Sequence, residues 1–260
     1  MHEAIGARRF NQRMNATPDL ISPFSAGAGL PEAITEDGCA LLPPVDKDIL
    51  DALTAALEAA DIAGRQRHGA VYAIRNLLEA VPAVADFARS AAALEIVRQV
   101  LGPGCFPVRG FLFDKNASAN WSVPWHQDLA IAVRERKVVE GFSAWTVKEG
   151  VLHVHPPNSV LDSMVTLRLH LDPCGAESGP LRVLPGSHRY GRLSAAQIDA
   201  LRQRATPRDM TAASGDILIM RPLLLHSSSI AVDPTRRRVI HLEYAAGLLP
   251  SGLEWHCISR

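Results

Sequence analysis

The chain has 260 residues, 47% of them hydrophobic, which is enough to bury one sizeable core. Its 27 basic and 27 acidic side chains balance, so no broad basic field favours nucleic acid or an anionic membrane as a partner. No apolar run approaches the length of a membrane span, and residues 1–10 lack the apolar core of a secretory signal. The four cysteines are scattered without paired spacing, which predicts reduced thiols in a cytoplasmic protein.

The N-terminal part is predicted to be an arm followed by helices. Residues 1–36 are rich in Pro, Ala, Gly and Ser and indicate an irregular arm or a short helix. Residues 37–44 predict a short strand closed by two prolines. One helix is expected from about Asp46, which can cap it, and a second helical region from about Pro82 until Gly102 stops it. We expect these helices to pack on a core and not to carry the site.

From residue 106 onward the pattern changes to short β-runs bounded by Gly, Pro, Asn or Asp. Many short strands with turn residues between them favour a sandwich or jelly roll over βαβ units. One helix with a Ser N-cap is expected within this region, at 194–204. The segment 135–158 has no clear period and is expected to be a long loop, which makes it a candidate lid. The expected strands are 106–113, 121–133, 163–171, 181–184, 217–220, 223–228 and 238–245.

A His-X-Asp pair, His126 and Asp128, lies in the run at 121–133. Residues two apart on an extended chain point to the same side, so the imidazole and the carboxylate would converge. A third candidate, His226, lies in the run at 223–228. Two imidazoles and one carboxylate form the facial triad that binds non-heme Fe(II). Each histidine alone would more simply be an ordinary core or surface side chain, but the three together favour a metal site.

Several pieces of the sequence occur together in a fixed order between about residues 37 and 246. They are Trp125-His126-Gln127-Asp128, Leu184-Pro185-Gly186-Ser187-His188, Gly215-Asp216-Ile217-Leu218, and His226-Ser227-Ser228 followed by Arg237. In this combination the chain resembles the phytanoyl-CoA dioxygenase-like family of Fe(II)/2-oxoglutarate-dependent oxygenases. The resemblance implies an α+β fold whose core is a double-stranded β-helix, the jelly roll also found in cupins. The expected single domain, 1–260, would consist of the arm, a helical flank at 37–105, the core at 106–246 and a tail at 247–260.

The resemblance also implies a cofactor set and a role for each ligand. Fe(II) would be bound by His126, Asp128 and His226, with 2-oxoglutarate as cosubstrate and O2 as oxidant. Related halogenases carry a small residue where this chain has Asp128, so the carboxylate implies hydroxylation or another oxidation. Arg237 and Ser228 resemble the family's anchor for the distal carboxylate of 2-oxoglutarate, for which a guanidinium fork is suited.

The strand register around this arginine is left open by the sequence. Arg236 and Arg238 flank Arg237, and in the alternation that follows, the more apolar face carries Arg238. Without the family spacing, three arginines at a solvated strand start would be the simpler interpretation. Phe111 and Gln127 are further candidates for the cosubstrate site. Lys115 lies where the family places such residues too, although a core Phe and a surface Lys are the simpler accounts.

Weaker candidates for substrate contact remain. In the run at 163–171, Thr166 and Arg168 alternate with aliphatic residues, so one face is polar. That face looks either into the cavity, where Arg168 would meet an anionic substrate or 2-oxoglutarate, or into solvent. His188 has a structural or a substrate-facing role, and Trp125 shields the iron or packs the core. His153 and His155 have no carboxylate partner in sequence and are expected not to be ligands.

The sequence therefore predicts a dioxygenase that hydroxylates a small organic substrate and releases succinate and CO2. One alternative is a non-catalytic jelly-roll protein that keeps a metal for binding or folding. Another is a cupin-type dioxygenase that does not use 2-oxoglutarate. The identity of the substrate, a link to CoA and the oligomeric state have no signal in the sequence.

Overall fold

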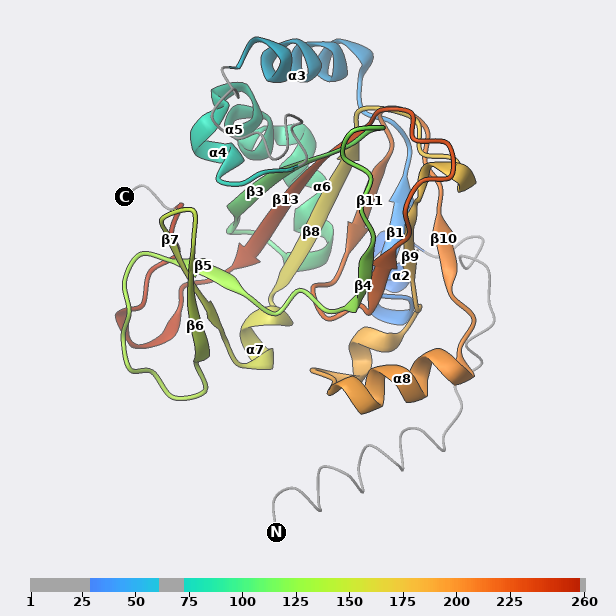
Figure 1. The fold of residues 1–260 in the computed structure, drawn as a ribbon. Helices are drawn as coiled ribbons and strands as arrows, with labels where there is room; N and C mark the ends of the chain where they lie inside the picture. The colour runs from blue at the N-terminus through green and yellow to red at the C-terminus, as the bar shows by residue number, and fades with distance from the viewer. Residues whose placement is uncertain (1–28, 61–72, 258–260) are drawn as a thin grey trace.

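The computed structural model describes residues 29–60 and 73–257, and its framework is two antiparallel sheets (Figure 1). The larger sheet has six strands in the order β1-β11-β8-β13-β3-β2, and the smaller has four in the order β10-β9-β12-β4. The crossed strand order and antiparallel pairing confirm the predicted jelly roll. The strands of the larger sheet are β1 (Cys39–Leu42), β11 (Ile217–Met220), β8 (Met164–His170), β13 (Arg237–Ala246), β3 (Cys105–Lys115) and β2 (Ala73–Ile74), and those of the smaller sheet are β10 (Arg208–Met210), β9 (Leu181–Val183), β12 (His226–Ser228) and β4 (Val123–His126).

The two faces of the larger sheet differ in polarity because side chains alternate along each strand. On β8, Leu167 and Leu169 pack into the main hydrophobic core, and Leu242 and Tyr244 of β13 join them. Helices cover this face, and the Tyr244 hydroxyl donates a hydrogen bond of 3.0 Å to the carbonyl of Ala88 (Figure 1). The opposite face carries the charged residues of the same strands and looks toward the smaller sheet. The helices of this region are α3 (Lys47–Ala59), α4 (Leu77–Ala80), α5 (Pro82–Arg89) and α6 (Ala91–Leu101).

Local signals explain where these helices begin and end. Asp46 caps α3 by accepting a hydrogen bond from the backbone of Asp48 at 2.9 Å, as predicted. The helical region from Pro82 is divided in two, because Ser90 is extended and its hydroxyl caps α6 instead of continuing α5. Within the arm expected at 1–36, the described part forms the short helix α2 (Leu30–Glu36). Residues 1–28 lie outside the described residues.

The segment 135–158 is not a long loop, and this expectation was wrong. It contains the hairpin β6 (Ser143–Lys148) and β7 (Val151–His155), which pairs with β5 (Ile131–Val133) as a separate three-stranded sheet. Glu149 and Gly150 connect β6 to β7 with φ values of 49° and 78°, a two-residue turn of the kind that joins hairpin strands. Val154 is buried in a second hydrophobic cluster, and Trp145 and Leu152 pack against it, which fixes the hairpin to the domain.

The remaining helices lie outside the large sheet. The expected helix at 194–204 is α8 (Ala195–Arg204), and Ser194 and Gln197 form a reciprocal capping box at its start. Trp125 lies on this side of the molecule, with the guanidinium groups of Arg182 and Arg202 each 5.9 Å from a ring centroid. The short elements are α7 (Asn158–Leu161), η2 (Ala176–Ser178), η3 (Ser187–Tyr190) and η4 (Pro250–Gly252). Among the described residues, no helix is long and apolar enough to cross a membrane.

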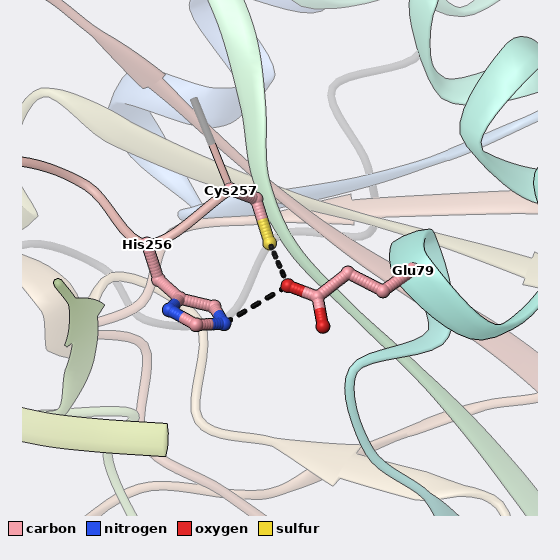
Figure 2. A group of neighbouring side chains, drawn as sticks. All are labelled: Glu79, His256 and Cys257. Carbon is pink, nitrogen blue, oxygen red and sulfur yellow. Dashed lines mark hydrogen bonds and ion pairs between the residues drawn. The ribbon is translucent and has the colours of Figure 1, made fainter. Parts of the chain in front are cut away.

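The end of the described chain is fastened to α4 by polar contacts. The Glu79 carboxylate lies 2.9 Å from Nε2 of His256 and accepts a hydrogen bond of 3.7 Å from the Cys257 thiol (Figure 2). Burial and then Glu79 raise the pKa of the Cys257 thiol to about 11, so it stays a protonated donor at neutral pH. These three side chains carry atoms that can bind a metal, but they contact one another here and tie the end of the described chain to α4. All four cysteines of the chain are free.

His188 belongs to the structural contacts of η3. Its Nε2 donates to the carbonyl of Thr35 at 3.2 Å, and its ring lies against Gly38 at the start of β1. Gly38 has φ +78°, and a Cβ added there would come 2.3 Å from Nδ1 of His188. The imidazole therefore fills the space that a side chain at position 38 would need.

We expect Gly38→Ala to destabilise the fold by more than Gly150→Ala. Both glycines have φ +78°, so both changes cost about 1–3 kcal/mol of backbone strain. Nothing lies within 4 Å of the added Cβ at Gly150, whereas overpacking against His188 adds about 1–3 kcal/mol at Gly38. Urea unfolding of both variants measures the difference. His188→Ala in the Gly38→Ala background should recover part of it, and equal stability of the two single variants would contradict this packing.

Candidate metal centre and cosubstrate pocket

The predicted triad is brought together by the pairing of β4 with β12. His126 and His226 are register partners on these antiparallel strands, and their ring centroids lie 4.2 Å apart. Asp128 follows β4 immediately, and its backbone nitrogen donates to the carbonyl of Pro222 at 2.9 Å. That hydrogen bond ties the carboxylate to the segment leading into β12. Residues 98 positions apart in sequence therefore meet because two short strands are neighbours.

The three side chains are spaced as metal ligands are, and no hydrogen bond joins them. The Asp128 carboxylate lies 3.7 Å from Nε2 of His126 through one oxygen and 3.7 Å from Nε2 of His226 through the other. Both distances exceed ordinary hydrogen-bond lengths. Oδ2 of Asp128 is buried and has no hydrogen-bond partner. A cation bound by both imidazoles and this carboxylate would satisfy that oxygen, so the residues fit a divalent metal of the Fe(II) type.

Backbone carbonyls hold both imidazoles in the tautomer that a metal needs. Nδ1 of His126 donates to the carbonyl of Pro124 at 2.8 Å, and Nδ1 of His226 donates to that of Leu224 at 2.8 Å. With the proton on Nδ1, the lone pair of Nε2 points toward Asp128 in each ring. Such outer contacts orient metal-binding histidines generally.

The electrostatics of the triad keep the ligands in their metal-binding protonation states. Burial raises the pKa of Asp128, but His226, His241, His126 and Arg109 outweigh it and hold the pKa at about 2. Burial lowers the pKa of His226 to about 4, with Asp128 opposing the shift. At neutral pH the carboxylate is ionised and the His226 imidazole is neutral.

A cavity of about 430 Å³ opens over the triad. Its walls come from both sheets, and Lys148 and His155 of the small hairpin sheet line it as well. The segment expected as a lid therefore borders the cavity as a folded hairpin. His155 supplies no metal ligand, and His153 is buried with Nδ1 bonded to the carbonyl of Val151.

Of the three consecutive arginines, Arg237 is the one that faces the cavity. Its side chain is 5% exposed, lines the cavity and donates to the carbonyl of Gly179 at 2.7 Å. Arg236 instead pairs with Asp114 at 2.9 Å, and Arg238 pairs with Asp172 at 2.8 Å. The flanking arginines are thus held by the carboxylates of Asp114 and Asp172, whereas Arg237 lines the cavity.

Lys115 contacts Ser228, which lines the cavity, and was missed as a buried residue. It is 1% exposed, and its ammonium donates to the Ser228 hydroxyl at 3.1 Å and to the carbonyl of Ser229 at 2.6 Å. Burial and then the charge of Arg237 lower the pKa of Lys115 to about 8. Register could have found it, because Lys115 on β3 is the direct partner of Arg237 on β13. Two buried cations and a hydroxyl form a pocket suited to a carboxylate.

The other predicted residues fall into two groups. Phe111 lines the cavity and contacts His241 edge-on at 5.4 Å. Gln127 also borders the cavity, but its amide hydrogen-bonds to the backbone of Gly191, Leu223 and Leu193, so its contact with a cosubstrate stays a prediction. The side chains of Thr166, His188 and Trp125 are not among those lining the cavity.

A chain of polar side chains along β13 was also missed. Arg109 binds both carboxylate oxygens of Glu243, at 2.8 and 2.5 Å. Glu243 lies 3.5 Å from Nε2 of His241, whose Nδ1 is 2.7 Å from Nη1 of Arg168. The signal was present in the sequence, since Arg237, His241 and Glu243 lie at odd positions of one strand. The polar face of β8 turns out to look into the cavity, with Arg168 lining it.

Comparison with known proteins gives a family and a fold. The family model described as phytanoyl-CoA dioxygenase matches residues 34–239. A comparison with curated proteins gives no match. Among solved structures, EctD from S. alaskensis with 2-oxoglutarate and 5-hydroxyectoine has a TM-score of 0.65 and 20% identity, covering 89% of this chain and 81% of that one. AviO1 from Streptomyces viridochromogenes has a TM-score of 0.63 and 20% identity, covering 88% of this chain and 99% of that one. HygX from Streptomyces hygroscopicus with nickel and 2-oxoglutarate has a TM-score of 0.57 and 17% identity, covering 82% of this chain and 84% of that one.

We expect the free energy of unfolding of the His170→Leu variant to fall less on acidification than that of the native chain. Neither ring nitrogen of this buried histidine has a hydrogen-bond partner in the structure, and burial, then Arg168, lowers its pKa to about 3. Between pH 6.5 and 3 the unfolded chain binds a proton that the folded one refuses, so stability falls as pH falls. At pH 4 this amounts to about 3 kcal/mol. Urea unfolding across pH 4–8 measures the slope. His155→Leu is the control, because this half-buried residue should change the slope less, and identical slopes for His170→Leu and the native chain would contradict the assignment.

Proposed function

The chain belongs to the phytanoyl-CoA dioxygenase family, and we propose that it is a dioxygenase that hydroxylates a small organic substrate with Fe(II), 2-oxoglutarate and O2. Succinate and CO2 would be the products of the cosubstrate. The observation that carries the proposal is the convergence of His126, Asp128 and His226 around one point, with an orphaned carboxylate oxygen facing it.

The triad would hold the iron from one side and leave the cavity side for ligands. When bound, the metal and cosubstrate supply the oxidising chemistry, and the protein supplies position and exclusion of water. The fixed Nδ1 hydrogen bonds keep both imidazoles aimed at the metal, so no side chain has to reorganise. The two sheets cover the site, and the hairpin residues Lys148 and His155 border its entrance.

Arg237, Lys115 and Ser228 would hold the distal carboxylate of 2-oxoglutarate. A guanidinium and an ammonium buried side by side repel each other, which is why Arg237 lowers the pKa of Lys115. A carboxylate between them removes that repulsion and accepts charge-assisted hydrogen bonds. Phe111 and Leu181 also line the cavity and would supply apolar surface to the rest of the ligand.

The alternatives explain less of this arrangement. A protein that bound a metal only for folding would have no use for a buried cationic pocket beside it. A dioxygenase without 2-oxoglutarate would leave Arg237 and Lys115 without a carboxylate partner among the described residues. Their contacts there are two carbonyls, the Ser228 hydroxyl, the Cys174 sulfur and the Trp121 ring. The solved relatives named above include structures with 2-oxoglutarate bound, which supports the cosubstrate for this chain.

The purified protein should bind one Fe(II) and one 2-oxoglutarate without oxygen. An anaerobic titration followed by the visible charge-transfer absorption of chelated Fe(II) measures both. Admitting O2 should then release succinate slowly without substrate and faster with one, as quantified by chromatography. Asp128→Ala should lose the absorption, because two neutral imidazoles hold iron weakly without the carboxylate. Wild-type protein that takes up Fe(II) yet leaves 2-oxoglutarate untouched under O2 would be a metal-binding protein or another oxidase.

Arg237→Gln should raise the Kd of 2-oxoglutarate at least about tenfold, while Fe(II) binding stays unchanged. The matched control is Arg236→Gln, since Arg236 is half-exposed and pairs with Asp114 instead of facing the cavity. The control should change the Kd less than about twofold, because Arg236 is not among the residues that line the cavity. The same titration reports both variants. Equal effects of the two changes would show that Arg237 is not the anchor.

A further inference from the structure

We propose that the substrate of this enzyme is an organic anion of the carboxylate class, bound through Arg168 where β8 lines the cavity. The inference rests on the proposed function, because it concerns the same cavity. It adds a recognition site that is separate from the pocket of Arg237 and Lys115.

Arg168 is buried, lines the cavity and has little to neutralise it. Its side chain belongs to the polar face of β8 and is 7% exposed. Nη1 hydrogen-bonds to Nδ1 of His241 at 2.7 Å, and Nε has no hydrogen-bond partner. Across the part of the chain that the structure describes, no carboxylate forms an ion pair with this guanidinium. The ring of Phe113 lies 5.6 Å from its central carbon and leaves the charge in an apolar setting.

The partner of Arg168 does not carry a compensating charge. To accept from Arg168, Nδ1 of His241 must be unprotonated, which places the ring proton on Nε2 facing Glu243 at 3.5 Å. Burial lowers the pKa of His241, which favours this neutral form. Glu243 is already bound through both oxygens by Arg109. The carboxylate of Glu243 therefore neutralises Arg109, and the neutral His241 orients Arg168 without neutralising it.

Apart from Lys148, which is exposed on the hairpin, the other cations at the cavity have a negative partner or one assigned to them. Arg109 has Glu243, and Arg75 at the rim has Glu149 at 3.4 Å. Arg237 and Lys115 would share the distal carboxylate of 2-oxoglutarate, and the metal would take its other end. No part of the cosubstrate is thus assigned to Arg168. Burial and then Arg237 lower the pKa of Arg168 only to about 10, with the charge of Asp128 opposing the shift, so Arg168 remains charged at neutral pH. Asp128 forms no ion pair with it and is assigned to the metal.

An unpaired buried charge is costly, and proteins keep one where a ligand supplies the partner. The planar guanidinium presents paired N–H groups that match a carboxylate, and the hydrogen bond to His241 holds its orientation. A substrate carboxylate at this point would be desolvated and fixed in the same cavity as the metal. That contact would select anionic over neutral molecules of the same shape.

Matched acids and amides test the charge requirement. The Fe(II)- and 2-oxoglutarate-loaded protein is titrated without oxygen with 3-phenylpropanoate and hexanoate, and with their primary amides, and the change in charge-transfer absorption is followed. Each acid should bind at least about tenfold more tightly than its amide. Arg168→Met should remove this preference, and Arg168→Lys should keep part of it. Arg75→Gln, which neutralises a paired cation of the same cavity, should leave the preference within about twofold of wild type.

Thermal unfolding of the ligand-free variants separates binding from a structural role. Arg168→Met should unfold at the same or a higher temperature than wild type, because an uncompensated buried charge has been removed. A large drop would mark Arg168 as a structural residue and overturn the inference. Equal affinity of acids and amides in wild type, or failure of both acids to bind, would also overturn it.

The cosubstrate provides the last comparison. The Kd of 2-oxoglutarate for Arg168→Met should stay within about threefold of wild type. If it rose more than the Kd values of the acids, Arg168 would serve 2-oxoglutarate and the inference would fail. Absence of the charge-transfer absorption in wild type would refute the proposed function itself, so the two failures are distinguishable.

Discussion

The pairing of two short strands, β4 and β12, is the constraint on which the site depends. It sets His126 opposite His226, and the hydrogen bond from Asp128 to the carbonyl of Pro222 adds the carboxylate to the same place. Short strands are weak on their own, so this pairing needs support from its neighbours. β9 supplies it on the other side of β12, and the apolar cluster between the sheets, which includes Leu181 and Val183, holds β9 in place.

The larger sheet places many charged side chains in the interior on one face and keeps the hydrophobic core on the other. Alternation along β8 and β13 sends leucines toward the helices and Arg168, Arg237 and Glu243 toward the cavity. Charges that serve structure, such as Arg109 with Glu243, are paired within the protein. Charges with carbonyls or neutral rings as partners lie where ligands are expected. The division between these two kinds identifies the functional surface of the barrel.

The sequence predicted the elements whose signals are local or tied to motifs. The triad followed from two-residue spacing and a strand-borne His226, and the caps at Asp46 and Ser194 marked helix starts. Residues whose role depends on strand pairing were harder. Lys115 resembled a surface lysine because nothing in its own run shows that Arg237 lies opposite, and the choice among Arg236, Arg237 and Arg238 depended on which face the carboxylates Asp114 and Asp172 occupy.

The hairpin at 143–155 was missed because β6 is mostly exposed, β7 is mostly buried and neither shows a clean alternation, so only the turn at Glu149 and Gly150 marks it. The chain of Arg109, Glu243, His241 and Arg168 was missed for a related reason. Its members come from three strands, and no segment of the sequence contains more than two of them. Such networks become visible only once register is known.

The protonation states of two candidate metal ligands have a consequence for metal uptake. Since His226 is neutral and Asp128 ionised well above the acidic range, these two side chains have no proton to give up when a cation arrives near pH 7. Cation exchange at these two positions would be governed by access and coordination strength, with little competition from their own protons.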